Sequence, residues 1–225
     1  TSSMNVARYH LAGCGDINNA LSFGGYNGSA GSFSTTEIWS GSSWATTSSL
    51  NGVRNNLAGC GNINNALSFG GYNGSYLSTT EIWSGSSWTT TSNMNVARYY
   101  LAGCGDINNA LGFGGYNGSI LSTTELFTRT TPNFVDGWRT VSSLNVARYH
   151  LTGCGNTNNA LSFGGYNGSA SFSTTEIWSG SSWTTTSNMN VARRALAGCG
   201  NINNALGFGG YNGSNLSTTE KWMKK

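Results

Sequence analysis

An internal repeat constrains this chain more than any other feature. Its third copy runs from Asn95 to Glu125 and reads NVARYYLAGCGDINNALGFGGYNGSILSTTE, and four further copies match it closely. The copies start 44 to 50 residues apart. A fixed period of that length is typical of solenoids and propellers, in which each copy is one unit that cannot bury its apolar face alone. We therefore expect residues 1–225 to form a single domain of five units.

Each copy keeps one arginine and one glutamate, and these are the only charged residues present in all five. A cysteine follows each arginine by six residues, and a Gly-Gly pair begins ten residues after the cysteine. The arginines are Arg8, Arg54, Arg98, Arg148 and Arg193, and the glutamates are Glu37, Glu81, Glu125, Glu176 and Glu220. Arginine–carboxylate pairs have specific geometry and are costly to break from one side. We expect structural ion pairs, with exposure to a ligand as the alternative.

One copy reads as four short strands. In the first copy these are Tyr9–Cys14, Ala20–Gly25, Thr35–Trp39 and Trp44–Thr47, which are rich in apolar, aromatic and threonine residues. Turn-forming residues separate them, including Asn27-Gly28. The same asparagine opens an NGS pattern in each copy. We expect these residues to serve the turn, with glycosylation as the alternative in a secreted chain. Each unit is therefore predicted to be a four-stranded antiparallel meander.

Closure of five meanders into a ring removes the apolar end faces that a linear solenoid would have to cap. The sequence has further marks of this architecture: a strand ending in Gly-Gly, a glutamate before an aromatic residue, a tryptophan seven residues later and an arginine ten after that. This pattern resembles the kelch repeat and covers the whole chain. The amino-acid sequence of the repeat is similar to short kelch-type repeats in predicted proteins of marine phages and environmental bacteria. The resemblance implies a β-propeller, although kelch propellers usually have six or seven blades.

The expected fold is thus an all-β, five-bladed β-propeller of four-stranded antiparallel blades. The last copy stops just after its third strand, at Lys225, whereas Thr1–Met4 has the sequence of a fourth-strand end. We predict that this N-terminal strand pairs in the last blade and closes the ring.

Composition excludes several function classes. The net charge is +3, and only 8% of the residues are charged, without the basic stripe of a nucleic-acid binder. No apolar run approaches the ~18 residues of a membrane span. The five cysteines lack a CxxC spacing and are expected to be buried thiols. We expect no cofactor, no metal and no enzyme activity.

The two positions after each arginine vary while their surroundings do not. They read YH, NN, YY, YH and RA, which indicates side chains free of packing. Aromatic and amide groups on a rim can stack on sugars, although neutral drift would give the same variation. The ligand-binding candidates are Tyr9, His10, Tyr99, Tyr100, Tyr149 and His150. A longer loop in the third copy adds Arg129, Phe134 and Asp136 as a second patch.

These observations predict a non-enzymatic recognition or adhesion module. Its expected partner is a glycan or a protein surface, bound at several near-equal sites so that avidity multiplies weak affinities. The expected setting is extracellular or virion-associated, for example in a virion fibre. The alternative is a structural building block of a virion or filament, with contacts between copies in a homo-oligomer or fibre. A His/Tyr pair at His10 or His150 can bind copper, but no acid–base pair accompanies it.

Overall fold

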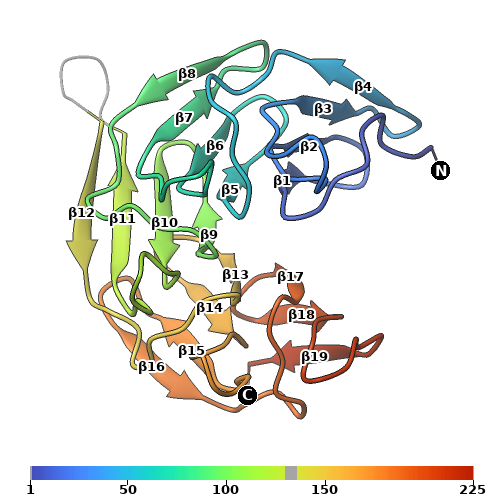
Figure 1. Cartoon of the computed structure of the whole chain (residues 1–225). Coiled ribbons are helices and arrows are strands. Elements are labelled where there is room, and N and C mark those ends of the chain that lie inside the picture. The colour runs from blue at the N-terminus through green and yellow to red at the C-terminus, as the bar shows by residue number, and fades with distance from the viewer. Residues whose placement is uncertain (1, 130–135, 225) are drawn as a thin grey trace. The chain divides into compact units, whose positions relative to one another are not determined.

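The computed structural model describes residues 2–129 and 136–224. These residues form five small antiparallel sheets, and none of them is helical. Figure 1 shows the strands of each sheet lying side by side in chain order. The prediction of an all-β chain built from five blade-like meanders is confirmed.

Four of the sheets have four strands, and the last has three among the described residues. The first contains β1 (Ala12–Gly15), β2 (Ala20–Phe23), β3 (Thr36–Trp39) and β4 (Trp44–Thr47). The second contains β5 (Ala58–Gly61), β6 (Ala66–Phe69), β7 (Thr80–Trp83) and β8 (Trp88–Thr91). The third contains β9 (Ala102–Gly105), β10 (Asn109–Phe113), β11 (Thr124–Thr128) and β12 (Gly137–Val141). The fourth contains β13 (Thr152–Gly155), β14 (Ala160–Phe163), β15 (Thr175–Trp178) and β16 (Trp183–Thr186). The last contains β17 (Ala197–Gly200), β18 (Asn204–Phe208) and β19 (Thr219–Met223).

The chain divides into two compact units. Unit 1 contains residues 1–99, 106–108 and 128–138, which include the first two sheets. Unit 2 contains residues 100–105, 109–127 and 139–225, which include the fourth and last sheets and most of the third. Ser2 to Met4 belong to no strand. The closing N-terminal strand and the single-domain assignment therefore stay predictions.

The first strand of each meander is shorter than the predicted Tyr9–Cys14. Tyr9 makes only an isolated bridge to Tyr26, and β1 begins at Ala12. The cause is His10, whose φ of 57° interrupts the extended backbone. At the other end, Gly24 and Gly25 have φ values of 69° and 106° and stop β2 at Phe23.

In unit 1, consecutive sheets pack through a phenylalanine, a glycine and a tryptophan. Phe23 lies so close to the next sheet that a Cβ on Gly59 would sit 2.5 Å from its ring. Trp88 crosses from the second sheet, with its ring centroid 4.9 Å from that of Phe23. Leu21 and Trp83 complete this core and are 1% and 0% exposed. Glycine is required at position 59 because a larger residue would collide with the aromatic ring.

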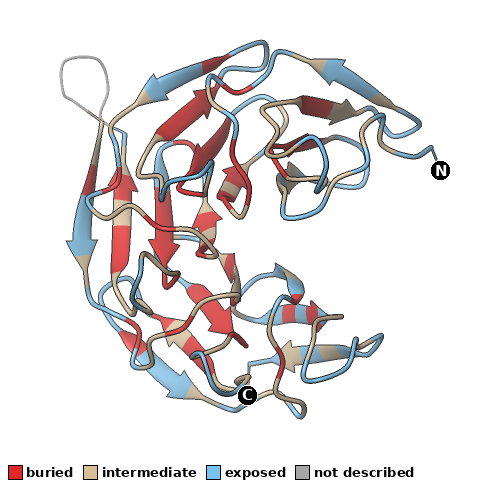
Figure 2. Cartoon of the chain, in the orientation of Figure 1, coloured by how far each residue is buried: buried red, intermediate tan, exposed pale blue. Residues whose placement is uncertain are grey.

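Unit 2 repeats the same packing. Phe113 lies 4.9 Å from Trp183 and 2.4 Å from the Cβ that Gly153 lacks. Figure 2 shows buried residues concentrated in the middle strands, such as β10 and β14, while β16 is largely exposed. The last sheet is less covered, with Leu206 and Phe208 of β18 each 39% exposed.

Candidate binding surface

In four of the copies, the variable position after the arginine lies beside an unchanging tyrosine. In the first copy the backbones of Tyr9 and Tyr26 exchange two hydrogen bonds, of 2.9 and 2.8 Å. Equivalent bridges join Asn55 to Tyr72, Tyr149 to Tyr166 and Arg194 to Tyr211. The fold therefore places the side chain that varies between copies next to a half-buried phenol ring from the GGYNG segment.

The second variable position has a left-handed backbone in every copy. The residues are His10, Asn56, Tyr100, His150 and Ala195, with φ between 51° and 57°. Their N–H groups link successive copies within each unit: Asn56 donates to the carbonyl of His10, His150 to Tyr100 and Ala195 to His150. A non-glycine residue in this conformation costs about 1–2 kcal/mol. This backbone strain recurs in all five copies. In proteins generally, such strain is found at functional sites or at positions that their surroundings hold tightly.

Unit 2 gathers three of the predicted residues into one aromatic cluster. The ring centroids of Tyr100 and His150 lie 3.6 Å apart, and that of Tyr149 lies 5.1 Å from His150. Tyr116 and Tyr166 flank Tyr149, each with its centroid 5.6 Å away. Burial, followed by the neighbouring Tyr166, raises the pKa of the Tyr149 phenol, although Arg194 opposes the shift. All these rings are half-buried, so part of each is open to solvent.

Arg194 extends this cluster along unit 2. Its guanidinium carbon lies 4.0 Å from the ring centroid of Tyr166 and 5.0 Å from that of Tyr211, which is cation–π geometry with both rings. An open groove of about 550 Å³ runs here, lined by both tyrosines, Arg194, Ser169 and Asn212. The groove thus combines two aromatic faces with a planar set of N–H donors and polar groups.

Unit 1 holds two smaller aromatic groups. Tyr9 contacts His10 and Tyr26 at centroid distances of 4.8 and 5.5 Å. Partial burial lowers the pKa of His10. Tyr99 stacks on Tyr76 at 5.5 Å with an interplanar angle of 25° and also contacts Tyr72. Within unit 1, the predicted residues Tyr9 and His10 share one aromatic group, and the predicted residue Tyr99 belongs to another.

The second predicted patch is only partly described. Arg129 lies 3.9 Å from the carboxylate of Asp136, and its side chain is 41% exposed. Asp136 also accepts a hydrogen bond from the hydroxyl of Thr91 at 3.1 Å. Phe134 lies outside the described residues. The described part of the patch is thus an ion pair whose carboxylate, Asp136, is bonded to β8.

Arginine and glutamate form buried pairs inside their own copies. The pairs observed are Arg8–Glu37, Arg54–Glu81, Arg148–Glu176 and Arg193–Glu220, of which the second measures 2.5 Å and the last 2.7 Å. Arg98 and Glu125 are each 0% exposed. Each observed arginine also donates to the first glycine carbonyl of its Gly-Gly pair, as Arg148 does to Gly164 at 3.0 Å. Through these hydrogen bonds, the arginine side chains hold the Gly-Gly backbone in place next to the variable positions.

The thiols and other metal-binding groups do not cluster in the described structure. No three His, Cys, Asp or Glu side chains in residues 2–129 and 136–224 lie close enough to hold one ion. Cys60, Cys104 and Cys154 are buried, and Cys199 is exposed on the last sheet. The described residues also contain no helix long and apolar enough to cross a membrane.

Sequence reasoning missed Arg194, Tyr166 and Tyr211. The tyrosines recur unchanged in every GGYNG segment, and that invariance beside a variable position was the available signal. Arg194 is the only cation at its position among the five copies. Comparison with protein-family models gave no match, and no curated protein matches the chain.

Proposed function

We propose that this protein is a non-enzymatic recognition module that binds glycans at several related sites. The observation that carries the proposal is the groove beside Arg194, where Tyr166 and Tyr211 flank a guanidinium. Aromatic faces provide apolar contact area at low conformational cost, and Arg194 adds directional N–H donors. Ser169 and Asn212 line the same groove and supply further hydrogen-bonding groups for sugar hydroxyls.

Other copies offer related surfaces around the same constant tyrosine. The observed bridges set one of three residue types against the constant tyrosine: tyrosine at positions 9 and 149, asparagine at 55 and arginine at 194. Several related sites on one chain add avidity when the ligand is itself repetitive. This supports a kelch-type adhesion module in an extracellular or virion-associated setting, where a dense glycan or a protein surface is the partner.

A glycan array printed at several densities tests this function. Arg194→Asn and Tyr149→Asn introduce a residue that the second copy carries at the same backbone position, Asn55, so both variants should fold. We expect either variant to reduce binding by about tenfold or more, most strongly at low glycan density. Thr184→Ala, on the exposed face of β16, is the control and should bind like the parent protein. Binding that is unchanged in Arg194→Asn and Tyr149→Asn would refute the assignment.

Ring closure belongs to the same proposal. Thr1–Met4 aligns with Thr186–Met189, and Thr186 pairs with Thr175 of β15. By this alignment Thr1 would pair with Thr219. A Thr1→Cys, Thr219→Cys double variant, with the five native cysteines changed to alanine, should then form an intramolecular disulfide under mild oxidation. A chain that stays fully reduced would contradict closure at this pair.

The alternative function is a structural building block. Leu206, Phe208 and Met223 are 39%, 39% and 58% exposed, and they give the last sheet an apolar face. Light scattering across a hundredfold concentration range distinguishes the two functions. A mass that rises towards filaments, with no response to glycans, favours the building block.

A further inference from the structure

The side chain of Arg194 takes a place that an aromatic ring fills at two other boundaries between copies. At those boundaries the equivalent residue is a tyrosine that contacts the constant tyrosine of the preceding copy. The two pairs are Tyr99 with Tyr72 and Tyr149 with Tyr116, at centroid distances of 5.4 and 5.6 Å. The guanidinium carbon of Arg194 lies 4.0 Å from the ring of Tyr166, also in the preceding copy. The last copy therefore sets a cation where the others set a neutral ring.

The residue that follows Arg194 leaves the guanidinium uncovered from one direction. In the first and fourth copies, the equivalent residue is a histidine whose ring packs on the tyrosine before it. These pairs are Tyr9 with His10 and Tyr149 with His150, at centroid distances of 4.8 and 5.1 Å. In the last copy the residue is Ala195, which is exposed and has no ring. Arg194 is therefore half-buried without the aromatic cover that its equivalents have in those two copies.

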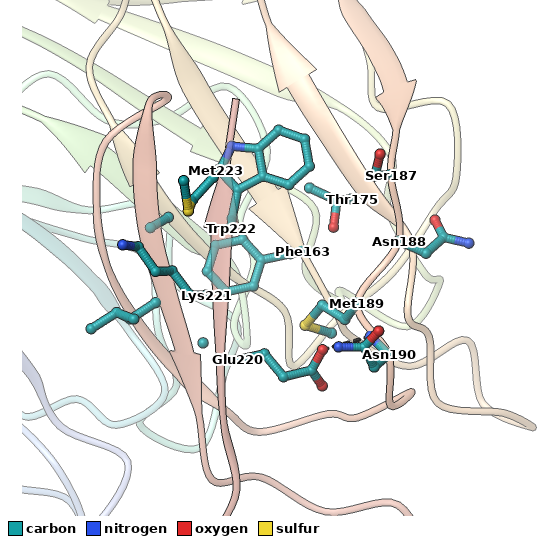
Figure 3. A pocket seen from close by; sticks show the side chains of 13 residues that line it. Phe163, Thr175, Ser187, Asn188, Met189, Asn190, Glu220, Lys221, Trp222 and Met223 are labelled. Carbon is teal, nitrogen blue, oxygen red and sulfur yellow. Dashed lines mark hydrogen bonds between the residues drawn. The ribbon is translucent and has the colours of Figure 1, made fainter. Parts of the chain in front are cut away.

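Arg194 has no acidic partner in unit 2, within the residues that the structure describes. Unit 2 contains three acidic residues, all of them glutamates of the repeat. Glu125 and Glu176 are 0% exposed, and Glu220 pairs with the arginine of its own copy at 2.7 Å. Figure 3 shows the carboxylate of Glu220 facing Asn190, whose backbone N–H donates to it at 2.5 Å. The positive charge of Arg194 is therefore available to an anionic ligand.

The groove around Arg194 has the form of a small-ligand site. Its volume of about 550 Å³ lies within the range of such sites, and Arg194 is the one charged residue among those that line it in the described structure. The hydroxyl of Tyr166 donates to the carbonyl of Gly168 at 2.8 Å, which holds one aromatic wall in place. The N–H groups of a guanidinium form a planar fork that matches the two oxygens of a carboxylate.

We propose that this groove selects acidic sugars, with Arg194 binding the carboxylate and the rings of Tyr166 and Tyr211 contacting the sugar. The inference rests on the glycan-binding function proposed above and names the ligand class of its main groove. A sugar ring presents C–H groups to an aromatic face, while its carboxylate projects from the ring edge towards the guanidinium. Uronic acids and sialic acids both have this combination of groups, so the test includes one of each.

The test compares trigalacturonic acid with its methyl ester, which keeps the three sugar rings and removes the charges. Calorimetric titration of the full chain should show about tenfold tighter binding of the acid, as expected for hydrogen bonds to a charged group. The preference should shrink as salt is added, because the half-buried guanidinium is screened. Sialyllactose against lactose is the second arm, and the larger of the two preferences identifies the uronic or the sialic acid as the better ligand.

Three variants assign the preference to Arg194. Arg194→Asn should bind the acid and the ester equally, and it introduces the residue that the second copy carries at this position, Asn55. Arg194→Lys keeps the charge without the planar fork, so its preference for the acid should fall to about threefold. Arg139→Gln removes an exposed charge of unit 2 on β12, outside the groove, and should leave the preference unchanged.

The outcomes separate this inference from the function on which it rests. Equal binding of acid and ester by the parent chain, weakened for both in Arg194→Asn, would refute the selection of acidic sugars and leave glycan binding in place. A preference for the acid that persists in Arg194→Asn, or a response to neutral glycans alone, would also refute it. Absence of binding to these sugars and to every glycan of the array would overturn both proposals.

Discussion

The indole N–H of Trp183 donates to the hydroxyl of Thr124 at 3.0 Å, from the fourth sheet to the third. The ring of Trp183 is 5% exposed and packs on Phe113, while Thr124 is 0% exposed. This contact joins residues 59 positions apart and couples two sheets that share no ladder hydrogen bonds. The packing of the fourth sheet on the third therefore depends on a directional hydrogen bond as well as on apolar burial.

Trp183→Phe should keep the aromatic packing and remove the donor. We expect a loss of about 1–2 kcal/mol in the free energy of unfolding, because the buried Thr124 hydroxyl is left without its partner. Trp183→Ala should cost about 3–5 kcal/mol, since a large cavity is added. Urea denaturation measures both, and Thr184→Ala on the same strand should stay within about 0.5 kcal/mol of the parent. A Trp183→Phe variant as stable as the parent would show that the hydrogen bond contributes nothing.

The buried ion pairs allow a matched comparison. In Arg148–Glu176 both side chains are 0% exposed, whereas in Arg193–Glu220 the glutamate is 13% exposed. Glu176→Gln should cost about 3–5 kcal/mol because it leaves a buried guanidinium charge unpaired. Glu220→Gln should cost clearly less, since water reaches that carboxylate. Chemical denaturation of the two variants decides the point, and equal losses would contradict the role assigned to burial.

Much of the fold could be predicted from the sequence because the repeat fixes the spacing of its strands. The predicted Trp44–Thr47 matches β4 at both ends, since threonine and aromatic residues strongly favour a strand there. The first strand was predicted too long, because nothing in its residue types marks position 10 as left-handed. Histidine, asparagine, tyrosine and alanine occupy that position in the different copies, and none of the five is glycine.

The candidate site was less predictable for a geometric reason. The variability after each arginine singled out Tyr100, Tyr149 and His150, and the rings of these three residues meet in one cluster. Arg194 was not predicted, because only its contacts with the rings on either side of it distinguish it from other surface cations. Tyr166 lies 28 positions before it and Tyr211 lies 17 after it. These three side chains come together only because the fourth and last sheets pack against each other.

Alkaline pH should destabilise the fold through its buried thiols. Burial raises the pKa of Cys154 from 9.0 to about 12. Between these values the thiol ionises in the unfolded chain but stays protonated in the folded one. The stabilising contribution is therefore complete below pH 9 and is lost as the pH rises towards 12, by about 1.4 kcal/mol per pH unit for each such thiol.

Cys154→Ala isolates this effect from the ionisation of tyrosines and lysines. The variant should lose less stability than the parent between pH 8.5 and 11, as measured by urea denaturation at each pH. Its stability at pH 7 should be slightly lower, because a small buried side chain is shortened. Parallel pH profiles for the two proteins would show that Cys154 ionises equally in both states.

Ala195 offers the cleanest measure of the strain at the repeated left-handed position. It is exposed, its φ is 52°, and its N–H donates to the carbonyl of His150 at 2.9 Å. Ala195→Gly removes a conformational cost of about 1–2 kcal/mol and adds about 0.5–1 kcal/mol of chain entropy in the unfolded state. We expect a net gain of about 0.5–1 kcal/mol. Ala45→Gly, in the extended backbone of β4, should instead lose about 0.5–1 kcal/mol. If both glycine variants are destabilised equally in thermal and urea unfolding, the left-handed residues store no strain, and their recurrence reflects only the hydrogen bonds that link successive copies.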